Sequence, residues 1–157
     1  TWDFSTTEYD FVSMIDMDGF DYLTVKNCRF IAETNTTGCA AAVQIEDSQN
    51  SIIDSNIFSG NFSVAMINST DSGVCENIMI TKNMMYNDDT KSGGGGIVFT
   101  AAHTGAIADN QIGWLGRAAY LDLTIDPGSC MQYNNSICTV IDTYGVTTGI
   151  GAASATA

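Results

Sequence analysis

The feature that most constrains this fold is a repeat of about 27 residues that runs through most of the 157-residue chain. Each copy has an apolar residue, a small polar residue three positions later, and a large apolar residue two positions after that. The last of these positions is held by Phe30, Phe58, Met85, Ile112 and Ile137, at spacings of 28, 27, 27 and 25 residues. A unit this short, built of strands without a helix, cannot bury its own apolar face. Neighbouring repeats must therefore stack and share one core.

The other two positions of the repeat form columns of their own. The apolar column is Val25, Ile53, Ile80, Ile107 and Gln132, and the polar column is Cys28, Asn56, Asn83, Asn110 and Asn135. Stacked strands lie about 4.8 Å apart, so four asparagines in register predict a ladder of amides at a turn where asparagine tolerates left-handed backbone. The competing interpretation is an antiparallel sandwich with asparagines marking its turns. It does not explain why the column stays in step over five repeats.

A second strand is expected between these segments. Its inward pairs are Ile15/Met17, Val43/Ile45, Ala65/Ile67, Ile97/Phe99 and Leu121/Leu123. The longer spacing between Ile67 and Ile80 predicts a loop inserted near residues 69–75. Phe4 lies 26 residues before Phe30 and predicts an earlier member of that column.

Residues between the inward columns are expected to point outward. The three outward columns are Thr24, Ile52, Met79, Ala106, Met131; Asp3, Arg29, Ile57, Met84, Gln111, Ser136; and Asp16, Gln44, Met66, Val98, Asp122. A contiguous exposed apolar stripe usually marks an interface. The candidates for an oligomer interface are Ile52, Met79, Ala106, Met131, Ile57 and Met84. A register slip of one residue would exchange the two faces.

Several of these segments carry a family resemblance. LTVKNCRF, SIIDSNIF and NIMITKNMM resemble coils of the right-handed parallel β-helix, the pectate-lyase-like superfold. The resemblance implies an all-β, single-stranded solenoid of about five to six coils over residues 1–143. Residues 144–157 then form a small-residue half-coil or tail. Because the chain opens at Thr1 in mid-coil, we expect a fragment of a longer protein.

The charge balance excludes some classes of partner. The chain has 18 Asp and Glu against 5 Lys and Arg, a formal net charge of -13, which argues against binding to nucleic acid or an anionic membrane. No apolar run is long enough for a membrane span. The single histidine, His103, and five cysteines without C-x-x-C spacing do not form a zinc site. We expect the cysteines to be small buried side chains, and no cofactor beyond a weak calcium site at turn carboxylates.

The superfold includes enzymes, so their motifs are a test of function. Galacturonase-type members carry Asn-Thr-Asp, Gly-His-Gly and Arg-x-Lys motifs, whereas His103 lies in Ala-Ala-His-Thr and the other two motifs do not occur. Asp18 and Glu46 occupy matching positions on successive coils and are the weak catalytic candidates, although stacked carboxylates are more often solvated turn residues. The aromatic candidates for glycan contact, as sugar-stacking platforms, are Trp114, Tyr86 and Tyr120.

These observations favour a non-catalytic structural or adhesive protein of a bacteriophage virion. It would be a tailspike, a tail fibre or a capsid-attached appendage, located on the virion surface or extracellularly. Such phage proteins form trimers side by side, so the resemblance implies a homotrimer, with other virion proteins and cell-surface polysaccharide as partners. The alternatives are a secreted polysaccharide lyase or glycoside hydrolase of the same superfold, and a cellular surface adhesin. The superfold hosts many activities, so the resemblance bears on architecture more than on function.

Overall fold

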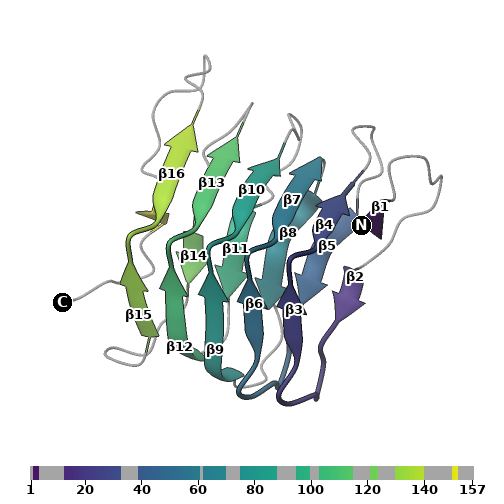
Figure 1. Ribbon diagram of the computed structural model, residues 1–157, viewed down its shortest axis with the longest axis vertical. Coiled ribbons are helices and arrows are strands. Elements are labelled where there is room, and N and C mark those ends of the chain that lie inside the picture. Colours follow the sequence, from purple (N-terminus) through teal and green to yellow (C-terminus); the bar gives the residue numbers. More distant parts are fainter. Residues whose placement is uncertain are drawn as a thin grey trace.

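The computed structural model describes residues 2–3, 13–32, 39–60, 62–69, 75–87, 95–99, 103–114, 121–123, 130–139 and 150–151. Within these ranges the regular elements are strands, arranged in parallel sheets (Figure 1). The chain is therefore all-β. No helix in this part of the chain is long and apolar enough to cross a membrane.

Three sheets hold the seventeen strands of the described residues. Sheet A contains β1 (Trp2–Asp3), β4 (Arg29–Ile31), β7 (Ile57–Gly60), β10 (Met84–Asn87), β13 (Gln111–Trp114) and β16 (Ser136–Thr139). Sheet B contains β2 (Ser13–Asp16), β5 (Cys39–Gln44), β8 (Phe62–Ser69), β11 (Gly95–Phe99), β14 (Leu121–Leu123) and β17 (Ile150–Gly151). Sheet C contains β3 (Thr24–Lys26), β6 (Ile52–Asp54), β9 (Cys75–Thr81), β12 (His103–Ala108) and β15 (Cys130–Tyr133).

Every strand pairs with the strand three places along the chain. The pairings between these strands are all parallel, and consecutive strands pass to the three sheets in turn. Parallel neighbours need a long connection, which here consists of the strands of the other two sheets. The antiparallel sandwich is therefore wrong, because its strands would pair in opposite directions.

The predicted columns on sheets A and C are confirmed by the pairing. Phe58 lies between Phe30 and Met85 on sheet A, and Ile53 lies between Val25 and Ile80 on sheet C. The rings of Phe30 and Phe58 stack with their centroids 4.9 Å apart. Buried side chains from all three sheets form one apolar core. Burying each such side chain contributes roughly 2 kcal/mol before the entropy of ordering is counted.

The expected register of sheet B is wrong by two residues at β8. Ile67 pairs with Val43 rather than lying beside Ile45, and Ser69 takes the expected place of Ile67 beside Phe99. A separate one-residue irregularity lies near the start of β8, where three steps from Phe62 to Ala65 oppose two from Cys39 to Ala41.

This shift also corrects the outward column of sheet B. Asn68, not Met66, lies in register with Gln44 and Val98. Met66 is fully buried and belongs to the apolar core, and Val98 is also buried. The expected exposure of these two apolar side chains is therefore wrong.

A second correction concerns the first strand. Trp2 pairs with Phe30, and Asp3 pairs with Ile31 instead of Arg29. Phe4, the expected member of the Phe30 column, lies outside the described residues. Because side chains alternate with a period of two, a slip of two residues preserves the apolar pattern that the prediction used.

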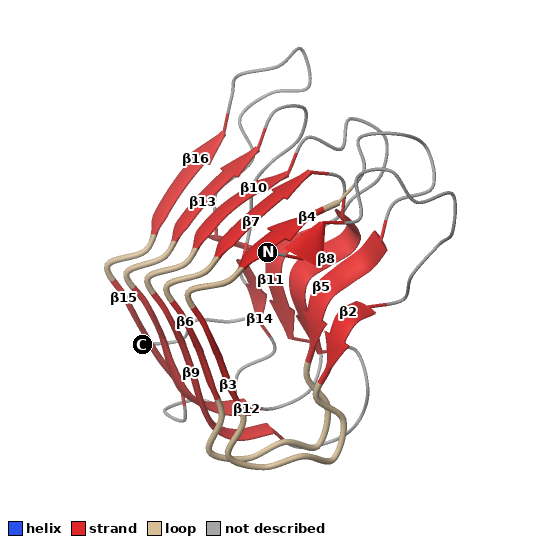
Figure 2. Cartoon of the chain, turned by 45° about the vertical axis from the view of Figure 1, so that its right-hand side comes forward, coloured by secondary structure: helices blue, strands red, loops and turns tan. Residues whose placement is uncertain are grey.

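Short turns join sheet C to sheet A, and each contains one residue in the left-handed region. These residues have φ between 55° and 57° and are Asn27, Ser55, Lys82, Asp109 and Asn134. Each precedes a residue of the polar column by one position, so the left-handed conformation does not fall on the predicted asparagines. In Figure 2 sheets A and C meet along this row of turns, and sheet B lies opposite.

Candidate functional site

The four asparagines of the polar column form a continuous hydrogen-bonded ladder. The Nδ2 atoms of Asn56, Asn83 and Asn110 each donate to Oδ1 of the next asparagine, the last being Asn135, at 3.0 Å. The same Oδ1 atoms accept the backbone N–H of the preceding asparagine at 3.0–3.1 Å.

The second amide hydrogen of each asparagine crosses to the previous repeat. The acceptors are the carbonyl oxygens of Val25, Ile53, Ile80 and Ile107, at 2.9–3.0 Å. Both amide donors of Asn56, Asn83 and Asn110 are therefore used, in a buried setting where an unmet donor is costly. Because Asn56, Asn83 and Asn110 are buried, the ladder stabilises the fold and does not form a binding site.

Cys28 occupies the first place of the ladder. Its backbone N–H donates to Asn56 Oδ1 at 2.9 Å, whereas its Sγ contacts the carbonyl of Lys26 at 3.3 Å. The side-chain donor that an asparagine would offer to Asn56 is absent here. The ladder therefore begins one rung later than the repeat would allow.

The interface candidates on sheet C do not form an unbroken stripe. Ile52 and Met131 are exposed and Met79 is half-buried, but Ala106 has 0% of its surface exposed. Its methyl group is short and lies in register between Met79 and Met131. The expectation that Ala106 presents an exposed surface is wrong, and the stripe is interrupted at β12.

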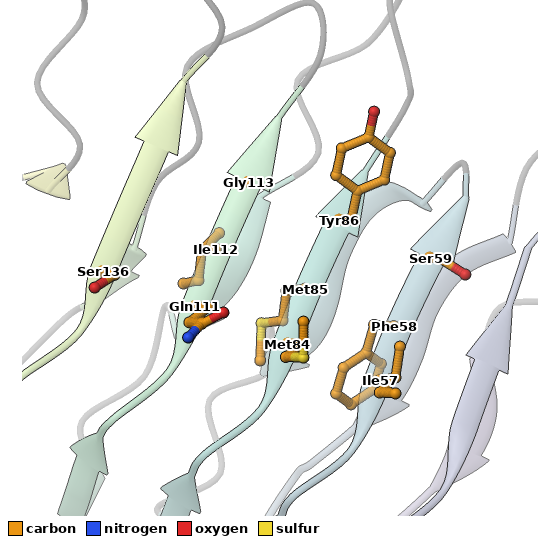
Figure 3. A pocket seen from close by; sticks show the side chains of 10 residues that line it. All are labelled: Ile57, Phe58, Ser59, Met84, Met85, Tyr86, Gln111, Ile112, Gly113 and Ser136. Carbon is orange, nitrogen blue, oxygen red and sulfur yellow. The ribbon is translucent and has the colours of Figure 1, made fainter.

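The interface candidates on sheet A lie side by side on its outer face. Ile57 and Met84 are in register and are 44% and 52% exposed. They border an open hollow of about 340 Å³ (Figure 3). Its lining comes from four adjacent strands and consists of Ile57, Phe58, Ser59, Met84, Met85, Tyr86, Gln111, Ile112, Gly113 and Ser136. Apolar residues predominate, and the side-chain amide and hydroxyl groups belong to four of the ten, Ser59, Tyr86, Gln111 and Ser136.

The glycan-contact candidates are placed unequally. Tyr86 is exposed and lines the hollow on sheet A (Figure 3). Trp114 is the last residue of β13, with its backbone in register with Asn87, and Tyr120 lies outside the described residues. The structure thus brings one glycan candidate and two interface candidates onto one surface. The two roles compete for that surface.

The two carboxylate candidates lie on adjacent repeats, as expected. The N–H of Gly19 donates to the backbone carbonyl of Glu46 at 2.9 Å, which sets Asp18 opposite Glu46. Asp18 is exposed, and Gln44 Nε2 donates to Glu46 Oε1. Within the described residues, no group of three or more His, Cys, Asp or Glu side chains is placed to hold a metal ion.

The sequence reasoning missed an exposed aromatic loop at residues 18–22, between β2 and β3. Phe20 and Tyr22 are 62% and 76% exposed. The loop is held to the next repeat because Tyr22 N–H donates to Gln49 O, and Gln49 N–H donates to Asp21 Oδ1, each at 2.9 Å. The available signal was Phe-Asp-Tyr directly after Asp-Gly, two aromatic residues in a polar turn.

One charged cluster lies on the outer face of sheet C. Lys26 Nζ is 2.8 Å from Asp54 Oδ2, and Thr81 Oγ1 donates to Asp54 Oδ1 at 2.7 Å. Ser55 Oγ also donates to this carboxylate at 3.1 Å. The hydrogen bonds from Lys26 and Thr81 lower the pKa of Asp54 to about 2. The cluster ties three successive repeats together.

The cysteines that the structure describes with side chains are free thiols. Cys39 and Cys75 are buried and Cys28 is half-buried. Burial raises the pKa of the Cys39 thiol to about 11, and the thiol donates to the Ala41 carbonyl at 2.8 Å. A thiol held protonated in this way is a poor nucleophile, which agrees with the expected structural role. His103 is buried with its ring centroid 4.3 Å from that of Phe99.

Comparison with known proteins adds no family. A scan of the chain against protein-family models found no match, and neither did searches of curated proteins and of solved structures. Function must therefore be argued from the surfaces and contacts described above.

Proposed function

We propose that the chain is a right-handed parallel β-helix that serves as a non-catalytic structural or adhesive part of a bacteriophage virion. A tailspike, a tail fibre or a capsid-attached appendage would each use such a rod. The cyclic passage of the chain through three parallel sheets supports the solenoid. Parallel crossover connections are right-handed in almost all proteins, which supports the hand.

The asparagine ladder is the observation that carries this proposal. It connects four successive repeats, and the amides of Asn56, Asn83 and Asn110 within it are buried and use both of their donors. In a repeat protein each unit contacts only its neighbours, so stability depends on the interfaces between units. A ladder along the core strengthens each of those interfaces. The result is a stiff rod, suited to holding a recognition surface away from a larger particle.

We assign the outer face of sheet A to packing between copies of the chain, as a homotrimer would require. Its floor is apolar, with Ile57 and Met84 partly exposed over Phe58 and Met85. Exposed apolar surface of this kind favours a protein partner. Contact with host glycan then belongs to turns and loops outside this face.

The adhesive role is tested by mixing the purified chain with bacterial surface polysaccharides. Retention of the chain by a polysaccharide, without release of shorter sugars or unsaturated ends, supports the proposal. Turnover that is lost in Asp18→Asn or Glu46→Gln contradicts it. Placement in a virion is tested by the genes next to its own, where portal or tail genes support it and a polysaccharide-degradation cluster opposes it.

The second candidate is a secreted polysaccharide lyase or glycoside hydrolase. The observation that favours it is the placement of Asp18 opposite Glu46 on adjacent repeats. Adjacent strands are about 4.8 Å apart, and glycosidases place their carboxyl pairs about 5–9.5 Å apart. The hydrogen bond from Gln44 makes Glu46 a turn-stabilising residue in the first candidate. The same turnover assay separates the two candidates.

A further inference from the structure

We propose that the loop of residues 18–22 of one copy of the chain docks into the hollow on sheet A of a second copy. This inference rests on the proposed structural role, in which copies of the chain associate. It goes further by naming the two surfaces that meet. They are different surfaces, so the contact is heterologous.

The loop is built to present its aromatic side chains. Gly19 and Tyr22 donate their N–H groups to Glu46 and Gln49 of the next repeat, and the Asp21 carboxylate accepts the N–H of Gln49. These bonds, each 2.9 Å long, fix the backbone at both ends of Phe20. A preorganised loop loses little conformational freedom when it binds.

Tyrosine is energetically unfavourable at position 22, because the backbone there is left-handed. Its presence therefore suggests that the ring has a functional role. The φ of Tyr22 is 60°, and the equivalent positions on the next two repeats are Asn50 and Asn77, each with φ 54°. The side chains of these asparagines bond to each other at 2.8 Å. Asparagine accepts left-handed backbone more readily than tyrosine. A side chain kept against its local preference, and left exposed, is a sign of function.

The charges around the loop define the partner it needs. Asp16, Asp18, Asp21 and Asp47 are all exposed at or beside it. A complementary surface must therefore combine apolar area with positive charge.

The hollow on sheet A meets both requirements. Ile57 and Met84 supply the apolar rim, and exposed Arg29 pairs in register with Ile57. Exposed Lys82 lies two residues before Met84. The volume of the hollow, about 340 Å³, is near the lower limit of small-molecule pockets. That size suits one or two aromatic side chains.

The two surfaces lie on different sides of the same molecule. The loop connects sheet B to sheet C (Figure 2), whereas the hollow is on the outer face of sheet A (Figure 3). Each copy can therefore give its loop to one neighbour and its hollow to another. Such contacts produce closed rings or open chains.

The test measures mass in solution by light scattering, at physiological salt and increasing protein concentration. The wild-type chain is expected to associate. Tyr22→Asn and Met84→Glu should each weaken association by about tenfold or more. Met131→Glu, the same change at a 64% exposed methionine on sheet C, should leave association unchanged. A monomeric wild type, or association that survives in Tyr22→Asn or in Met84→Glu, would overturn the proposal.

Two further readouts separate docking from folding. Tyr22→Asn should keep or raise the Tm, since asparagine suits the left-handed position. If Tyr22 had only a structural role, its replacement by asparagine would instead lower the Tm and leave association unchanged. Mixing Tyr22→Asn with Met84→Glu should restore a dimer, because one variant keeps the hollow and the other keeps the loop. Wild-type association with no effect of Tyr22→Asn would reject this inference but leave the proposed rod intact.

Discussion

At the scale of single residues, the structure is governed by where amide and carboxyl groups find partners. Asn83 donates to Asn110 and to the Ile53 carbonyl, and its Oδ1 accepts two bonds from Asn56. The sequence predicted this column because asparagine recurs at a fixed place in the repeat. It did not predict the left-handed residues one position earlier, whose identities vary too much to form a pattern.

Replacing Asn83 with aspartate should disrupt the ladder from within. The Asn83→Asp change removes both amide donors and places a buried carboxylate oxygen against Asn110 Oδ1 and the Ile53 carbonyl. We expect a loss of about 3–4 kcal/mol in the free energy of unfolding at pH 7. Urea unfolding measures it. Gln111→Glu makes the same chemical change on the surface and should shift stability by less than about 0.5 kcal/mol; equal effects of the two changes would contradict the ladder.

Extending the ladder should have the opposite effect. In Cys28→Asn the new Nδ2 can donate to Asn56 Oδ1, as each later rung donates to the next. We expect a gain of about 0.5–1 kcal/mol, read from the same unfolding curves. Cys28→Ser is the control, since its shorter side chain cannot reach in the same way, and it should give no gain.

The Asp54 cluster predicts a dependence of stability on pH. Its pKa is lowered from 3.8 to about 2 in the folded chain, so its contribution is present above pH 4 and is lost as the pH falls toward 2. Asp54→Asn should cost about 1–2 kcal/mol at pH 7, allowing for the exposure of Lys26. Near pH 2 most of the difference between the variant and the wild type should be gone, because about half of the folded chains then carry a protonated Asp54. A difference at pH 2 as large as that at pH 7 would show that charge is not the cause.

At the scale of strands, part of the register could be predicted and part could not. On sheets A and C the large inward residues recur at nearly constant spacing, and the pairing follows them from Phe30 to Ile137. On sheet B the pairing places Ile67 two residues from its expected register, beside Val43. A shift of two keeps every side chain on its face, so hydrophobic alternation cannot detect it.

The surfaces were harder to predict than the pairing, for a related reason. Exposure depends on what covers a position, and Ala106 and Met66 are buried although their alternation places them outward. The exposed ring of Tyr22 was not predicted because this residue lies in a turn, outside the periodic columns of the repeat. The surface residues of the candidate site could therefore be identified only from the structure, whereas the repeat alone predicted the stacking of parallel strands.

Two glycines are required by the close approach of neighbouring strands. A Cβ at Gly60 would lie 2.1 Å from the Ala32 carbonyl oxygen, and one at Gly105 would lie 2.1 Å from that of Ile78. Their φ angles of 112° and 123° also disfavour any other residue. Gly60→Ala and Gly105→Ala should each cost about 3 kcal/mol or more in unfolding free energy.

Gly19 provides the matched control for these changes. Its φ is 66°, but no atom lies within 4 Å of an added Cβ. Gly19→Ala should therefore cost only about 1 kcal/mol, the strain of a left-handed alanine. Calorimetric melting of the three variants measures the difference. An equal loss at all three sites would mean that the strands do not approach as closely as described.

At the scale of the whole molecule, the charge of -13 is unevenly placed. The three basic residues in the described part, Lys26, Arg29 and Lys82, lie on β3, on β4 and in the turn before β10. The exposed carboxylates of the 16–21 segment lie at the corner between sheets B and C. This separation of charge is what the proposed contact between copies of the chain requires.

The repeats stack into three parallel sheets, and the asparagine ladder links successive repeats at the turns between sheets C and A. A crystal structure of the chain tests this arrangement at the ladder itself. We expect Asn56, Asn83 and Asn110 in one buried row, with Nδ2 of each about 3.0 Å from Oδ1 of the next. Asparagines lying apart on exposed turns, between antiparallel strands, would contradict it.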